Sequence, residues 1–135
     1  FNASTGLLTE PVLLDIRDGR LTALRHPDPA LADRLRAWFR RDAGAARIGE
    51  LAVGTNRACR ELSGNLLFDE TVPGCHIALG HPFGDYTGAD WTSAVHVDLV
   101  VDRPTIHVDG RALIVDGRYP GDPSEPPDRP DPESA

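Results

Sequence analysis

One short segment alternates apolar and polar residues so regularly that it constrains the fold of the whole chain. Between Ser93 and Asp102, valine or leucine occupies every second position, and His96 and Asp98 stand between them. This period of two is typical of a β-strand with one buried face. Side chains two residues apart on a strand share a face and lie about 6 to 7 Å apart. The segment therefore predicts a sheet that presents an imidazole and a carboxylate side by side.

A second segment, residues 75–80, shows the same alternation and places His76 opposite its larger apolar side chains. Glu50 lies within a further strand candidate, residues 47–54, and Glu70 lies shortly before the second segment. Imidazoles and carboxylates are costly to bury unless they are paired or bound to a metal. Two interpretations stay open at this level: separate hydrogen-bonded pairs of histidine and acid, or a divalent-metal site on a sheet.

The other patterns predict an α+β domain that is mostly β, with a mixed or antiparallel sheet. Asp18-Gly19 and Asp109-Gly110 each separate two apolar runs, which is a strong hairpin signal. Leucine and aromatic residues recur at helical spacing within Pro29–Asp42, directly after an aspartate that can cap a helix. One main helix is expected there. Residues 81–92 are rich in glycine, proline and aspartate and are expected to form a loop over the site.

Charge and composition exclude several classes of partner. All 14 basic residues are arginine, and 21 acidic residues bring the formal net charge to −7. Nucleic acids and anionic membranes favour clustered positive charge, so neither is expected as a partner. No apolar run approaches the roughly 20 residues of a membrane span, and no signal peptide is recognised, so a cytoplasmic location is expected. Cys59 and Cys75 are too few for a disulfide framework and are expected to be free thiols.

The domain organisation is expected to be simple. Residues 1–119 form a single domain, and residues 120–135 form an acidic, proline-rich tail without large apolar residues, which predicts disorder. Phe1 is not a natural start and the chain contains no methionine, so we expect a segment of a longer protein or a processed form. An open sheet with an apolar cleft face also predicts a homo-oligomer or pairing with another chain.

Three motifs follow one another in a fixed order along the chain. They are Gly49-Glu50, then Asp69-Glu70 followed by CHIALG at residues 75–80, and finally SAVHVD at residues 93–98. Together they resemble the C-terminal domain of the M29 family of thermophilic-type metallo-aminopeptidases. The resemblance spans roughly Thr5–Tyr119, so residues 1–119 are interpreted as a single M29 C-terminal-like domain, from a truncated homologue.

What the resemblance implies is a co-catalytic pair of divalent metals, with zinc, cobalt or manganese as candidates. The implied metal ligands on this chain are Glu50, His76, His96 and Asp98. Glu70 is the implied general base, and Tyr86 is a looser match to the family's site tyrosine because it falls a few residues late after His76. The implied reaction is hydrolysis of a peptide at its free amino terminus, in which metal-activated water loses its proton to Glu70.

Two alternative functions stay open beside the aminopeptidase. The family has a further glutamate ligand and an N-terminal domain before the part that this chain matches. The first alternative is therefore a truncated, non-catalytic protein that binds or regulates peptides in a bacterial natural-product pathway, with open sheet edges for an extended chain. The second is an iron(II) ring-cleaving dioxygenase, because the dioxygenases of 2,5-dihydroxypyridine share the fold. Those enzymes use two histidines and one aspartate, which His76, His96 and Asp98 supply.

Overall fold

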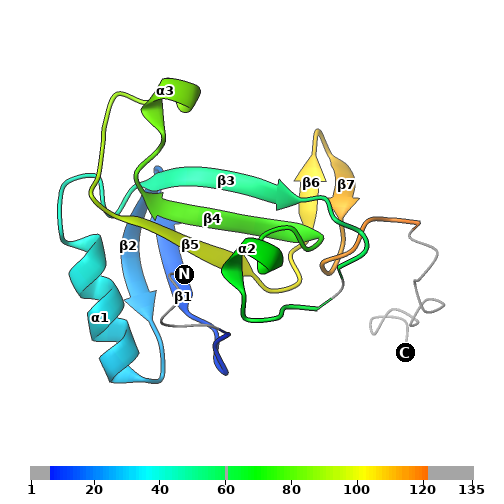
Figure 1. The fold of residues 1–135 in the computed structure, drawn as a ribbon, viewed down its shortest axis with the longest axis horizontal. Helices are drawn as coiled ribbons and strands as arrows, with labels where there is room; N and C mark the ends of the chain where they lie inside the picture. The colour runs from blue at the N-terminus through cyan, green and yellow to red at the C-terminus, as the bar shows by residue number, and fades with distance from the viewer. Residues whose placement is uncertain (1–6, 60, 122–135) are drawn as a thin grey trace.

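The structure, a computed structural model, describes residues 7–59 and 61–121 (Figure 1). Every strand pairing in this part of the chain is antiparallel, and the strands form three sheets with the orders β1-β2, β3-β4-β5 and β6-β7. The predicted α+β, mostly β fold is confirmed, and of the mixed and antiparallel sheets it is the antiparallel one that forms. In chain order the elements are β1 (Leu13–Arg17), β2 (Arg20–Arg25), α1 (Pro29–Phe39), β3 (Ile48–Gly54), α2 (Leu66–Asp69), β4 (Gly74–Gly80), α3 (Gly84–Thr87), β5 (His96–Val101), β6 (Ile106–Val108) and β7 (Arg111–Ile114).

The register of the three-stranded sheet decides which polar side chains meet. Glu50 on β3 pairs with Ala78 on β4, and Ala78 pairs with Asp98 on β5, so these residues form one row across the sheet. His76 precedes Ala78 by two residues and His96 precedes Asp98 by two. The period of two therefore places all four polar side chains on one face. The fully buried Ala78 occupies the middle of the row with a single methyl group.

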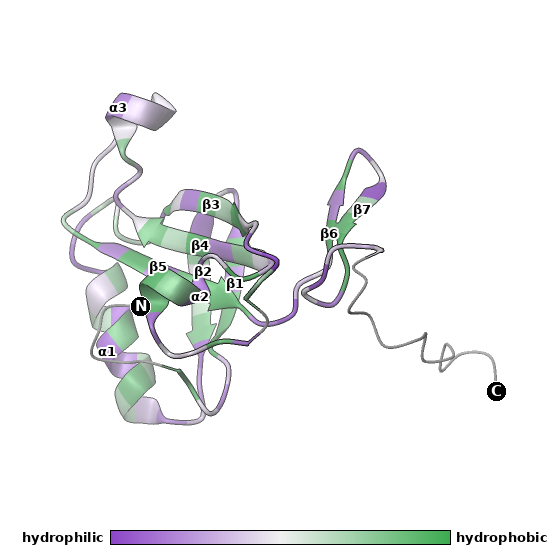
Figure 2. Cartoon of the chain, turned by 45° about the vertical axis from the view of Figure 1, so that its right-hand side comes forward, coloured by the Kyte–Doolittle hydropathy of each residue, from purple (hydrophilic) through white to green (hydrophobic). Residues whose placement is uncertain are grey.

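The opposite face of the sheet holds the hydrophobic core. Leu79 and Val97 are buried there and join Leu35 and Phe39 of α1 in one apolar cluster. Hydrophobic and hydrophilic residues alternate along the α1 ribbon in Figure 2, as expected for a helix with one buried stripe. The buried stripe of α1 and the core-facing residues of the sheet thus cover one face, which leaves the polar row on the other.

The main helix begins where it was expected and ends sooner. Asp28 is the N-cap and accepts a hydrogen bond from the backbone N–H of Ala30 at 2.8 Å. The helix ends at Phe39 rather than at the predicted Asp42. Asp42 instead accepts hydrogen bonds from the N–H groups of Gly44 and Ala94, both at 2.9 Å, and from the Ser93 hydroxyl at 3.0 Å. It thereby ties the end of α1 to the segment that leads into β5.

Both predicted hairpins are confirmed. The turn residues Asp18 and Gly19 have φ angles of 50° and 69°, and Asp109 and Gly110 have 49° and 75°. Positive φ at both central residues is what the type I′ turn requires, and aspartate followed by glycine tolerates it better than most pairs. Figure 1 shows the β6-β7 hairpin as a separate projection beside the end of the main sheet.

Residues 81–92 were expected to form a loop, and most of them do, but the single-turn helix α3 interrupts it. The Thr87 hydroxyl donates to the Pro82 carbonyl at 2.8 Å, and Gly88 ends the turn with a φ of 73°. A helix of one turn needs no repeating apolar pattern, so the glycine and proline signals around it dominated the prediction. The equally short α2 was not predicted from the sequence, for the same reason.

Three further expectations concern the chain as a whole. Cys59 and Cys75 are free thiols, and burial raises the pKa of Cys75. In the ranges that the structure describes, no helix is both long and apolar enough to cross a membrane. The predicted tail lies almost entirely within residues 122–135, which are outside the described residues.

Candidate metal centre

Four polar side chains from three strands meet on the open face of the central sheet. Glu50 directs one carboxylate oxygen to each of two imidazoles, with Oε1 3.2 Å from His76 Nε2 and Oε2 3.6 Å from His96 Nε2. On the same strand as His96, the Asp98 Oδ1 lies 3.2 Å from His96 Nε2. The structure therefore brings together all four residues that the sequence suggested as ligands.

Glu70, the expected general base, approaches the cluster from the end of α2. Its Oε2 lies 3.9 Å from His76 Nε2, beyond hydrogen-bond distance. The preceding residue, Asp69, is buried and accepts hydrogen bonds from the Ser63 N–H at 2.6 Å, the Ser63 hydroxyl at 2.8 Å and the Gly64 N–H at 2.8 Å. This clamp fixes the end of α2 and with it the place of the Glu70 carboxylate.

The two imidazoles differ in how they are held. His96 Nδ1 lies 2.9 Å from the His81 carbonyl oxygen, which can only accept, so Nδ1 carries a proton and Nε2 faces the carboxylates. The Phe83 ring also packs edge-on against the His96 ring, with centroids 4.8 Å apart. Such outer partners orient histidine ligands in metal sites. By contrast, His76 Nδ1 is buried with no hydrogen-bond partner among the residues described.

The geometry of the cluster fits a divalent ion. Two donors bound to one tetrahedral ion at about 2.1 Å lie about 3.4 Å apart, close to the 3.2 to 3.6 Å between the imidazoles and carboxylates here. One donor atom each from Glu50, His76 and Asp98 lie within 4.8 Å of one another. Nitrogen and carboxylate oxygen donors suit zinc, cobalt and manganese.

The charge of the cluster also favours a bound divalent cation. Glu50, Glu70 and Asp98 bring three carboxylates together, and their side chains are only 33%, 27% and 16% exposed. Clustered, partly buried charges of one sign are unfavourable unless a counter-charge compensates them. A divalent cation would supply that counter-charge. The His76 side chain is 7% exposed and that of Glu50 33%, so the centre is closed near His76 and open to solvent near Glu50.

Tyr86 is far more exposed than the residues of this cluster. It belongs to α3, is 92% exposed, and its hydroxyl makes no hydrogen bond to the described residues. It lines a cavity of about 230 Å³ together with Phe83 and Trp91. Its catalytic role, like the roles of the ligands and of Glu70, stays a prediction.

Two supporting features were not anticipated from the sequence. The His81 carbonyl that orients His96 is a backbone group, and no side-chain pattern reports where a backbone oxygen will point. The Asp69 clamp left a weak signal, because the small residues Ser63 and Gly64 lie a few positions before an aspartate that directly precedes the expected base. Recognising it required knowing that this loop folds back onto α2.

The sheet and its donor cluster define a domain with a candidate divalent-metal centre on one face. Comparison with models of protein families goes further: the thermophilic metalloprotease family M29 matches residues 3–118. The chain therefore belongs to the M29 family, which supports a metallopeptidase-like function and implies a divalent metal. Neither the comparison with curated proteins nor that with solved structures found a match.

Proposed function

We propose that this domain supports metal-dependent aminopeptidase chemistry, the hydrolysis of a peptide bond next to a free amino terminus. The observation that supports this most directly is the placement of Glu50, which faces two imidazoles on neighbouring strands with its two oxygens. Glu50, His76 and Asp98 would share one ion, since their donor atoms lie within 4.8 Å of one another. His96, beside Glu50 and Asp98, would be the ligand that extends the site toward a second ion. Divalent ions bound in such sites polarise a carbonyl and lower the pKa of bound water.

Side chains of the protein would accept the proton from water and contribute to recognition of the peptide. The Glu70 carboxylate lies at the rim of the cluster, and its contact with His76 Nε2, at 3.9 Å, is beyond hydrogen-bond distance, so an oxygen is available to accept a proton from water. The Asp69 clamp holds it there. The unprotonated amino terminus of a peptide would bind the metal as a further ligand, which selects peptides with a free amino group over blocked ones.

The dioxygenase alternative is less well supported. An iron triad needs only His76, His96 and Asp98, and its remaining positions stay open for oxygen and the aromatic substrate. Here Glu50 touches both imidazoles and Glu70 stands close to His76, so two additional carboxylates surround the triad. Membership of the M29 family favours the peptidase as well.

Metal content is the first test. Protein purified without chelator is analysed by inductively coupled plasma mass spectrometry, beside the variant His96→Ala. We expect about one or two equivalents of zinc, cobalt or manganese per chain, as in one- or two-metal hydrolases, and a loss of metal in the variant. Stoichiometric iron would support the dioxygenase, and metal-free wild-type protein would contradict the proposed centre.

Activity is the second test. Leucine para-nitroanilide is compared with its N-acetylated analogue, before and after removal of metal with EDTA. We expect hydrolysis of the free amine only, abolished by EDTA and restored by zinc or cobalt. In the variant Glu70→Gln we expect unchanged metal content with kcat reduced about 10² to 10⁴-fold, the usual contribution of a general base. A Glu70→Gln variant with the wild-type rate would refute the role of Glu70.

A further inference from the structure

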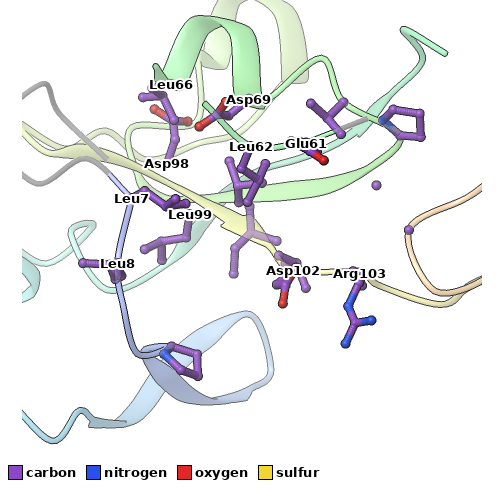
Figure 3. Close-up of a pocket in the computed structure, with 18 of the residues that line it drawn as sticks. Leu7, Leu8, Glu61, Leu62, Leu66, Asp69, Asp98, Leu99, Asp102 and Arg103 are labelled. Carbon is purple, nitrogen blue, oxygen red and sulfur yellow. The ribbon is translucent and has the colours of Figure 1, made fainter. Parts of the chain in front are cut away.

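An elongated apolar groove of about 1070 Å³ follows the outer edge of β5. Six consecutive residues of this strand and its end, Asp98 to Arg103, line the groove, so both faces of the strand contribute and the groove follows the backbone. Figure 3 shows Leu7 and Leu8 from the N-terminal segment on one wall and Leu62 and Leu66 near α2 on the other. The volume exceeds the usual 300 to 1,000 Å³ of small-molecule pockets only slightly.

The strand at the bottom of this groove has a free side. In the order β3-β4-β5, β5 pairs with β4 on one side, and no strand of the described residues pairs with the other. Alternate residues of an edge strand direct their backbone N–H and C=O groups away from the sheet, here toward the groove. An extended chain can satisfy these groups as an additional strand while its side chains enter the apolar walls.

The two ends of the groove differ. Asp98 lines one end and belongs to the candidate metal centre, whereas Arg103 lies at the other end (Figure 3). β5 itself continues from Asp98 to Val101, a length of about 10 Å at about 3.3 Å per residue. Asp102 and Arg103 line the groove beyond the end of the strand. A peptide of about five residues would therefore pair with β5 over its first three or four residues. The groove is thus continuous with the centre and long enough for more than a dipeptide.

Charge indicates which end of a peptide belongs at Asp98. The lining carries five carboxylates against three guanidinium groups, a formal charge of −2, which favours a ligand with a protonated amino group. These charged residues are Glu61, Asp69, Asp98, Asp102, Asp116, Arg57, Arg103 and Arg118. Arg103 also forms an ion pair with Asp116 at 3.7 Å, so it offers only a moderate attraction to a carboxylate.

We propose that this groove binds an extended apolar peptide of about five residues as an additional strand beside β5, with the free amino terminus at Asp98. The peptide then runs parallel to β5, from Asp98 toward Arg103. Only this direction rests on the proposed aminopeptidase function. Binding itself involves the strand edge and the apolar walls, and it requires neither metal nor hydrolysis.

The experiment measures binding in EDTA, where hydrolysis is excluded. A pentapeptide of leucine, valine and alanine with a C-terminal fluorescein is titrated with the full chain, and anisotropy gives the Kd. Two further peptides carry N-methyl groups at positions 2 and 4 or at positions 3 and 5. Only one of these sets faces the β5 edge, so we expect that one peptide binds about tenfold or more weakly while the other binds normally. N-acetylation is expected to weaken binding by about tenfold.

A matched pair of variants tests the walls. Leu66 lines the groove and is half-buried, whereas Leu67, its neighbour on α2, is 77% exposed and lies outside it. We expect Leu66→Asp to weaken binding about tenfold and Leu67→Asp to bind as wild type does. The N-methylated peptides use the wild-type chain, so the test remains decisive even if Leu66→Asp does not fold.

Several results would overturn the proposal. They are no binding in EDTA, equal binding of the two N-methylated peptides, or equal losses in Leu66→Asp and Leu67→Asp. Sedimentation velocity adds another: a wild-type dimer that Leu66→Asp dissociates, without peptide binding, would assign the groove to a second copy of the chain. Binding in EDTA without any aminopeptidase activity would refute the proposed function alone, and activity without pentapeptide binding would refute the groove alone.

Discussion

Replacing Glu50 with glutamine distinguishes a metal centre from a set of histidine–acid pairs, because the two interpretations predict effects of opposite sign. The substitution Glu50→Gln keeps the size of the side chain and removes one of the three clustered negative charges. In a metal centre this relieves repulsion in the metal-free protein and weakens the metal-bound one. If Glu50 instead only pairs with a histidine, the substitution removes a stabilising contact, and zinc does not change the stability of either protein.

The magnitudes follow from the geometry. Donor oxygens of Glu50 and Asp98 lie within 4.8 Å, and two unit charges at that distance repel by about 3.5 kcal/mol at an effective dielectric constant of 20. Partial exposure of both groups reduces this to about 1 to 2 kcal/mol. The amide makes a weaker hydrogen bond to His76, at a cost of about 1 kcal/mol. Without metal, the free energy of unfolding should therefore stay constant or rise by about 1 kcal/mol.

With metal the sign reverses. Zinc at about 100 times its Kd stabilises the wild-type protein by about 2.7 kcal/mol. A ligand change that weakens affinity about 100-fold leaves about 0.4 kcal/mol at the same zinc concentration. The assay is urea unfolding followed by tryptophan fluorescence, in EDTA and in zinc, with Glu10→Gln on the exposed N-terminal segment as the control. A Glu50→Gln variant that loses stability in EDTA yet responds fully to zinc would refute the metal centre.

Three other substitutions or reactions probe the surroundings of the centre. A Cβ on Gly80, which has a φ of +112°, would collide with the Val95 carbonyl, so Gly80→Ala should lower the free energy of unfolding by about 2 to 4 kcal/mol. Because Gly80 pairs with His96, the substitution should also weaken zinc binding by displacing His96. Gly110→Ala, with open space around the added methyl group, should bind zinc normally, and urea unfolding and zinc titration test both variants. The hydrogen bond from Ala94 lowers the pKa of Asp42 from 3.8, so its stabilising effect is present above that pH and is lost as pH falls through the lowered pKa. Wild type should therefore be more stable than Asp42→Asn at pH 7 and the two should converge in acid, and a difference that persists there would contradict this. Burial raises the pKa of Cys75 from 9.0, so mass spectrometry should show slower alkylation by iodoacetamide at pH 8 than for an exposed peptide cysteine; equal rates would contradict the shift.

Local sequence patterns predicted much of the fold and part of the candidate site. The period of two placed His96 and Asp98 on one face of a strand, and the Asp-Gly pairs located both hairpins, because these signals depend on neighbours in sequence. The partnership of Glu50 with Asp98 could not be derived in the same way, since Ala78 joins them only after three distant strands pair. One-turn helices such as α3 are too short to show a period. The Tyr86 hydroxyl on α3 makes no hydrogen bond within the described residues, so no pattern of paired residues could place it.

The row of Glu50, Ala78 and Asp98 also connects metal binding to folding. Glu50 and Asp98 belong to strands that never pair with each other, and only β4 between them sets their relative position. A slip of one residue in either pairing would turn a donor to the core side of the sheet. Metal affinity would then report the register of all three strands, and assembly of the centre would coincide with completion of the sheet.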